Sequence, residues 1–135
     1  MAHRKVILVG SNPSEKSPDN SPFHIDTRSR IIIDEWFRDI PCQISFINIC
    51  PEKTPGNKPL THKSIRNHLL PFSKRLKSLD GDKVIALGRT AEYGCQILGI
   101  PFLAMPHPSG LNRQLNDKEF VAKKIEELRK FIDER

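Results

Sequence analysis

Three polar side chains, each placed directly after an apolar run, could take part in chemistry. Asn12 lies in a Gly-Ser-Asn-Pro-Ser turn, Asn48 falls at the end of a second apolar run, and His107 opens a His-Pro-Ser-Gly-Leu turn. An amide has no useful basicity, but it offers a hydrogen-bond donor and an acceptor and can therefore hold a water molecule. A histidine nitrogen can donate to an oxygen that gains negative charge in a reaction. Together these groups suit a reaction that needs an oriented water and a stabilised leaving anion.

The elements that must position these turns can be predicted from the spacing of apolar residues. Short continuous apolar runs are typical of buried parallel strands, and they occur at residues 6–9, 43–49, 83–87 and 101–104. Apolar residues three and four apart predict helices over residues 32–40, 61–79, 89–98 and 116–132. In the last of these, Asn116 and Glu119 form a predicted capping box.

Strands and helices therefore alternate four times along the chain. This order predicts an α/β fold in which a four-stranded parallel sheet is covered by helices on both faces, as three α/β/α layers. Neither a repeat nor a linker interrupts it, so we predict a single domain over residues 1–135. Ligands of such sheets bind beyond the carboxyl ends of the strands, where Asn12, the loop after Ile49, Arg89 and His107 would all lie.

Composition limits the class of protein. The 135 residues are 37% hydrophobic and 28% charged, as expected of a soluble domain. No apolar run is long enough to span a bilayer and no secretion signal is evident, so we expect a cytoplasmic monomer without membrane association. The net charge of +6 favours a polyanionic partner.

The cysteines and histidines predict no cofactor and no metal site. The three cysteines, Cys42, Cys50 and Cys95, lie far apart without a Cys-x-x-Cys pair, which argues against a zinc ribbon or an iron–sulfur cluster. Their odd number argues against a disulfide framework. The other histidines show no metal-binding spacing.

Several segments, taken together and in this order, resemble motifs of the uracil-DNA glycosylase superfamily. Residues 6–13 resemble its first motif, and Asn12 matches the asparagine that positions water in the mismatch-specific branch. Residues 84–91 resemble the Leu-Gly-x-x-Ala turn of the iron–sulfur branch, although the cysteines of that cluster are missing. The resemblance extends over most of the chain and implies the same three-layer fold.

The resemblance also implies roles for single residues. Phe23 would stack on a flipped base, and Asn48 would read the O4 and N3–H edge of a pyrimidine. In residues 107–111, similar to a His-Pro-Ser-Pro-Leu motif, His107 would bond the departing base and Leu111 would wedge into the duplex. The remaining predicted base contacts are Ser11 and Ser14, and the remaining predicted DNA contacts are Lys58, Arg89, Ser109, Gly110 and Arg113.

Ser14 bears on the choice of base. Its position in the first motif holds a tyrosine in many relatives, where the ring blocks a substituent at pyrimidine C5. The smaller serine predicts tolerance of 5-substituted pyrimidines.

The function implied is a DNA glycosylase that flips uracil or a modified pyrimidine out of single- or double-stranded DNA and hydrolyses its N-glycosidic bond. Two alternatives stay open at this point. One is a hydrolase of free nucleosides or nucleotides on the same scaffold, and the other is a non-catalytic nucleic-acid-binding relative.

Overall fold

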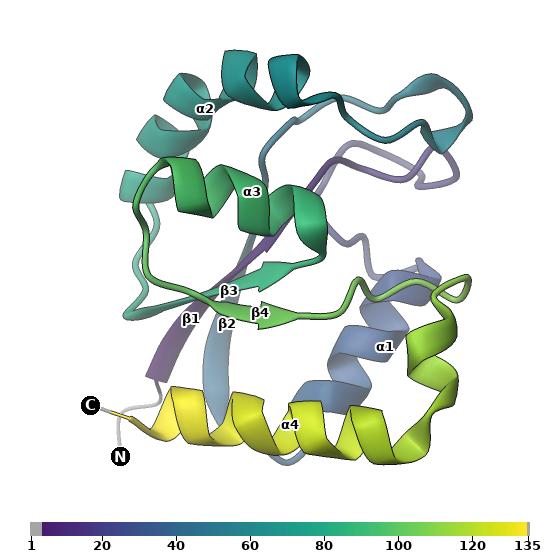
Figure 1. Ribbon diagram of the computed structural model, residues 1–135, viewed down its shortest axis with the longest axis vertical. Helices are drawn as coiled ribbons and strands as arrows, with labels where there is room; N and C mark the ends of the chain where they lie inside the picture. The colour runs from purple at the N-terminus through teal and green to yellow at the C-terminus, as the bar shows by residue number, and fades with distance from the viewer. Residues whose placement is uncertain (1–3, 135) are drawn as a thin grey trace.

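Within residues 4–134, which the computed structural model describes, four parallel strands form one sheet in the order β2-β1-β3-β4 (Figure 1). Residues 1–3 and 135 lie outside the described residues, so the predicted ends of the domain are untested. The strands are β1 (Arg4–Gly10), β2 (Cys42–Asn48), β3 (Lys83–Leu87) and β4 (Leu103–Met105). Both neighbours of β1 run parallel to it, which makes β1 a central strand.

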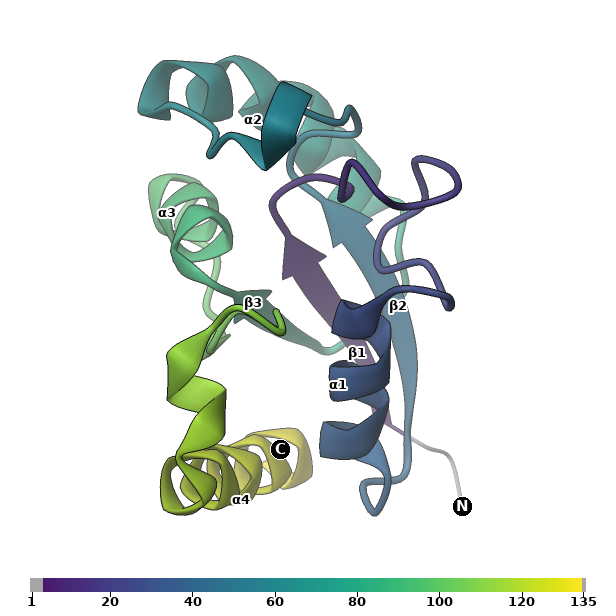
Figure 2. The same ribbon diagram turned by 90° about the vertical axis from the view of Figure 1, so that its right-hand side faces the viewer.

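Helices cover both faces of the sheet (Figure 2). They are α1 (Arg28–Phe37), α2 (His62–Lys77), α3 (Arg89–Ile97) and α4 (Lys118–Asp133). Successive side chains of β1 point to opposite faces, as they must in a strand. Val6 and Leu8 pack in a core with α1 and α4, whereas Ile7 and Val9 pack in a second core with α2 and α3. The predicted three-layer α/β/α fold is confirmed.

Two predictions about the C-terminal part are wrong in detail. The fourth strand begins at Leu103, which pairs with Ile85, and not at Pro101. Proline has no N–H to give to the ladder, so pairing starts after it. The N-cap of α4 is Asp117, whose side chain accepts from the backbone N–H of Phe120 at 3.1 Å. Asn116 instead ends a short 3-10 helix, η2 (Arg113–Asn116).

Other predicted features agree or differ by a few residues. The predicted cap at Thr61 is present, and α2 continues through Pro71 without a break. The loop before α2 contains a second 3-10 turn, η1 (Pro55–Asn57). In α4, Leu128 and Ile132 are fully buried, and the other predicted core residues, Phe120, Val121 and Ile125, are half-buried. No helix in the described range is both long and apolar enough to cross a membrane.

The topology places the ends of the strands where a ligand could bind. From β1 the chain crosses to β2 on one side and later returns to β3 on the other, so the direction of winding changes between β1 and β3. Open α/β sheets bind ligands beyond such a switch point. Two backbone bonds, Ile49 N to Gly10 O (3.0 Å) and Cys50 N to Ser11 O (2.8 Å), join the loops after β1 and β2 there.

Candidate functional site

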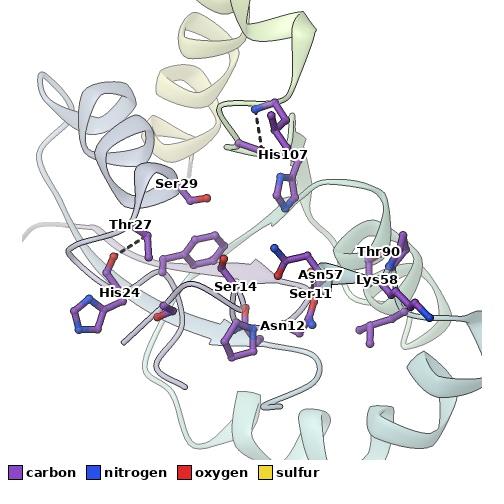
Figure 3. Close-up of a pocket in the computed structure, with 18 of the residues that line it drawn as sticks. Ser11, Asn12, Ser14, His24, Thr27, Ser29, Asn57, Lys58, Thr90 and His107 are labelled. Carbon is purple, nitrogen blue, oxygen red and sulfur yellow. Dashed lines mark hydrogen bonds between the residues drawn. The ribbon is translucent and has the colours of Figure 1, made fainter. Parts of the chain in front are cut away.

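A cleft of about 430 Å³ lies at this end of the sheet (Figure 3). Its walls come from the loops after β1, β2 and β4 and from the first turns of α1 and α3. Most of the residues predicted for the site line this cleft: Ser11, Asn12, Ser14, Phe23, Asn48, Lys58, His107, Ser109 and Leu111. His107 reaches into the cleft opposite Ser14 and Asn57 (Figure 3). The fold thus brings residues that are far apart in the sequence to the walls of one cavity.

Asn48 ends β2 with a buried side chain, only 5% exposed. Its backbone carbonyl accepts a hydrogen bond from Nη2 of Arg75 on α2 at 2.9 Å. The side-chain amide makes no hydrogen bond to another group within residues 4–134, and Asn48 lines the cleft. Buried polar groups are nearly always hydrogen-bonded. A free donor and acceptor held at a cavity wall are therefore available to a ligand.

Gly10 brings the side chains of Asn48 and Phe23 together. A Cβ at this position would lie 2.5 Å from Oδ1 of Asn48 and 2.6 Å from Cζ of Phe23. Real Cβ atoms do not come so close to other heavy atoms. The Asn48 amide and the Phe23 ring therefore occupy the space that a side chain at residue 10 would fill. The ring lies beside the amide that would hydrogen-bond to a planar ligand.

Phe23 adopts a left-handed backbone conformation, with φ of 50°. This region costs an L-residue about 1–2 kcal/mol, so other contacts must hold it. Nη1 of Arg30 on α1 donates to the carbonyl of Phe23 at 3.1 Å. The same guanidinium lies 4.5 Å from the ring centroid of Phe46 and donates from Nε to Asp34 at 3.1 Å. Arg30 thus fixes the loop that carries the Phe23 ring.

Both the oxygen and the nitrogen of the Asn12 side-chain amide form hydrogen bonds. The Ser11 hydroxyl donates to Asn12 Oδ1 at 2.9 Å. Nδ2 of Asn12 donates to Oγ1 of Thr54 at 3.3 Å and approaches the carbonyl of Glu52 at 3.5 Å. The loop after β2 therefore sets the orientation of the amide. Oδ1 keeps one lone pair that can accept from a water in the cleft.

His107 follows β4 and packs against the backbone of Gly88. A Cβ at residue 88 would lie 3.1 Å from Cδ2 of the ring, and Gly88 has a φ of 88° that favours glycine. Within residues 4–134, no protein group forms a hydrogen bond with the ring. The surrounding protein disfavours the charged imidazolium and lowers the pKa of His107 below its usual value of 6.5. The ring is therefore neutral at pH 7 and has one N–H to donate.

The turn after His107 is fixed by short-range hydrogen bonds. The carbonyl of His107 accepts from the N–H of Ser109 at 2.9 Å and from Nδ2 of Asn112 at 3.0 Å. Oγ of Ser109 accepts from the N–H of Leu111 at 3.2 Å, which leaves its hydroxyl proton to donate elsewhere. Leu111 stands at the cleft mouth with 93% of its surface exposed. An apolar side chain so exposed on a rigid turn is placed to contact a partner.

Three predicted DNA contacts do not line the cleft. Arg89 begins α3 and borders a neighbouring hollow that also includes His107. Arg113 is exposed on η2, and Gly110 is exposed on the turn, where an added Cβ would lie 3.5 Å from Arg28. All three surround the site without facing into it.

Other lining residues were absent from the sequence prediction. Asn57, which has a φ of 54°, accepts a hydrogen bond from the N–H of Glu15 at 2.7 Å and so joins the loops after β1 and β2. The Gly-Asn pair at residues 56–57 is a turn signal that could have drawn attention to it. The other polar lining residues are Ser17, Ser21, His24, Thr27, Ser29 and Thr90. No pattern in the sequence distinguishes them.

Across the described ranges, no group of three or more His, Cys, Asp or Glu side chains is arranged to hold a metal ion. The cleft instead offers amides, hydroxyls, one aromatic face, the imidazoles of His24 and His107 and the ammonium group of Lys58. Such groups are suited to a polar planar ligand, which they could hold by hydrogen bonding and stacking.

The fold and the site define a class: three-layer α/β proteins with a polar cleft beyond the carboxyl ends of their parallel strands. Residues 1–129 match the family model of the Uracil DNA glycosylase superfamily, and the chain belongs to that superfamily. Membership supports a glycosylase-type activity with DNA as the partner. A search of curated proteins found no match.

Proposed function

We propose that the protein is a DNA glycosylase that hydrolyses the N-glycosidic bond of uracil or a 5-substituted pyrimidine. The observation that carries the proposal is the unpartnered, buried amide of Asn48 beside the Phe23 ring in the cleft that His107 enters. An amide has a donor and an acceptor side by side, as the O4 and N3–H edge of uracil requires. The corresponding groups of cytosine are reversed.

The proposed reaction begins with a nucleotide flipped out of the stack. The base stacks on Phe23 and pairs with the Asn48 amide. As the C1′–N1 bond breaks, its electron pair leaves with the base, and negative charge develops on the base carbonyl oxygen. The N–H of neutral His107 stabilises that charge.

Water completes the reaction. Asn12 orients a water molecule whose oxygen forms the new bond to C1′, and the proton released from this water balances the charge of the departing base. Because Asn12 lacks the basicity of a carboxylate, catalysis relies on position and on stabilisation of the leaving anion. Leu111 fills the vacated stack in a duplex, a known use of apolar side chains. Lys58, Arg89, Ser109 and Arg113 contact phosphates around the site.

The test is a panel of oligonucleotides that each carry one modified base, treated with the protein and then with alkali to cleave abasic sites. Strand cleavage at uracil or a 5-substituted uracil is the expected result. Release of base from free nucleosides but not from oligonucleotides would favour the nucleoside hydrolase. DNA binding without any cleavage would favour the non-catalytic relative.

A further inference from the structure

The positive charge of the chain is concentrated in one segment. Residues 41–79 contain seven Lys or Arg and one Asp or Glu, a net charge of +6. The formal net charge of the whole chain is also +6, so acidic and basic residues balance in the remainder. Five of the seven cations belong to α2, which has no acidic residue.

Four of the α2 cations share one exposed face. Lys63, Arg66, Lys74 and Lys77 are all exposed, and Leu70 between them is 68% exposed. Their spacing of three, four, four and three residues places the five side chains within an arc of about 80° around the helix. With a rise of 1.5 Å per residue, this row is about 21 Å long. We call these five residues the basic stripe.

The basic stripe begins next to the cleft. Pro59 and Leu60 line the cleft, and α2 starts two residues later at His62. The His62 ring stacks on Tyr93 of α3 at 4.2 Å, and Nε of Arg66 donates to the Tyr93 hydroxyl at 3.1 Å. From this fixed end, α2 runs away from the loops that form the cleft (Figure 1).

The opposite layer has no comparable face. Helix α1 carries two basic and two acidic residues, and α4 carries five basic and four acidic residues. Two of the α4 charges, Lys124 and Glu127, already pair with each other at 2.8 Å. The charge asymmetry therefore distinguishes the α2 surface from an evenly charged, solvated one.

We infer that the basic stripe binds the sugar–phosphate backbone of DNA that continues beyond the nucleotide held in the cleft. The inference rests on the proposed function for the position of that nucleotide. A row of about 21 Å matches roughly six nucleotides at 3.4 Å per nucleotide. Lys and Arg contacts to phosphate carry no sequence information, so the stripe adds affinity for any flanking sequence. Leu70 adds an apolar contact between the two pairs of cations.

The test compares two variants with equal changes of charge. K63Q/K74Q/K77Q removes three charges from the stripe and leaves Arg66 and its bond to Tyr93 in place. K123Q/R129Q/K130Q removes three exposed charges from α4, in the opposite layer. Glutamine is a good helix former, so both helices should persist, which circular dichroism and thermal melts check.

Binding is measured over a range of salt concentrations on two probes that contain the best substrate base of the panel. One is an oligonucleotide of about 5 nucleotides, which fills only the cleft, and the other is a duplex of about 25 base pairs. On the long probe, the stripe variant should bind at least about tenfold more weakly, and its salt slope should fall by about 0.9 for each lost phosphate contact. On the short probe it should bind like wild type, and the α4 variant should match wild type on both.

Three results would overturn the inference: equal losses in the two variants, equal losses on the two probes, or wild-type binding by the stripe variant. In the last case, loss of binding to vesicles containing phosphatidylserine would identify a membrane surface as the partner instead. The outcome is separable from the proposed function. If wild type excises no base but the long probe still shows the stripe-dependent loss, only the proposed reaction fails.

Discussion

Asn12 is the residue for which the proposed reaction makes the most specific prediction. Asn12→Ala removes the amide that would orient water but leaves the stacking ring and the Asn48 amide unchanged. We expect turnover to fall roughly 10²-fold, the cost of a badly placed reactant, with DNA affinity nearly unchanged. Single-turnover kinetics and a binding titration measure the two effects. Asn67→Ala, an amide deletion at an exposed position of α2, is the control. Wild-type turnover in Asn12→Ala would remove the water-positioning role.

His107 gives the protein a predictable response to pH. Partial desolvation by the neighbouring protein lowers the pKa of His107 in the folded state below 6.5, whereas in the unfolded chain the pKa stays close to that value. Below about pH 6.5 the unfolded chain takes up a proton that the native protein resists, so stability falls as the pH falls. His107→Gln should therefore show a smaller drop in Tm than wild type between about pH 7.5 and pH 5. Parallel curves for the two proteins would contradict the lowered pKa.

Ser14 is exposed and lines the cleft, where its hydroxyl oxygen accepts from the N–H of Lys16 at 3.3 Å. A side chain this small leaves room beside the base. We expect wild type to process both uracil and 5-hydroxymethyluracil, and Ser14→Tyr to retain uracil only. Excision rates on matched oligonucleotides provide the comparison, with Ser14→Ala as the control that keeps the space open. If wild type rejects the substituted base as fully as Ser14→Tyr does, the idea of an open pocket fails.

At the scale of elements, β1 ends in a glycine because two site residues occupy the space beside it. Gly10→Ala would push apart the Asn48 amide and the Phe23 ring, since its Cβ would lie within 2.6 Å of both. Gly81→Ala is a matched control, because its Cβ would lie 2.6 Å from Cγ1 of Ile7, away from the cleft. Overpacking of this kind costs about 1–3 kcal/mol.

Both glycine variants should therefore melt earlier than wild type, but they should differ in base recognition. We expect the inhibition constant of free uracil to rise about tenfold or more in Gly10→Ala, because small displacements of positioning groups are costly. Gly81→Ala should keep the wild-type inhibition constant. A similar rise in both variants would mean that general destabilisation, and not the local displacement, weakens the site.

The order of strands and turns in the sequence was enough to predict which end of the sheet carries the site. Asn12, Asn48 and His107 each follow an apolar run, and parallel strands bring such positions to one edge. The supporting contacts were not predictable in this way. Arg30 reaches the carbonyl of Phe23 only because α1 packs beside that loop, and Thr54 reaches Asn12 only because two loops meet. Such contacts depend on how the segments pack in three dimensions, and the spacing of residues in the sequence does not indicate this packing.

Local signals also failed where two neighbouring residues had the same chemistry. Asn116 and Asp117 can both cap a helix, and residue spacing favoured the first because Glu119 stands three residues later. The chain instead uses Asn116 to finish η2, which leaves Asp117 to cap α4. The preceding 3-10 helix, η2, determines which of the two residues caps α4, and the apolar pattern did not reveal this short helix.

For the whole molecule, we expect catalysis to be independent of divalent cations. The polar side chains that line the cleft are amides, hydroxyls, two imidazoles and the Lys58 ammonium group, and no three potential metal ligands gather within residues 4–134. Excision rates should be the same in EDTA and in added Mg²⁺ or Zn²⁺, with a metal-dependent nuclease as the positive control for chelation. Loss of activity in EDTA that a divalent ion restores would contradict the proposed chemistry.

The distribution of the site over the chain sets an order of events during translation. Phe23 and Asn48 leave the ribosome early, together with β1 and β2. The loops that follow these two strands are hydrogen-bonded to each other, and one of these bonds joins Asn12 to Thr54. His107 and Leu111 follow only after β4, and a domain generally folds as a unit. A chain that stops before β4 therefore lacks the group that would stabilise the departing base. Products of stalled synthesis would then be harmless to DNA.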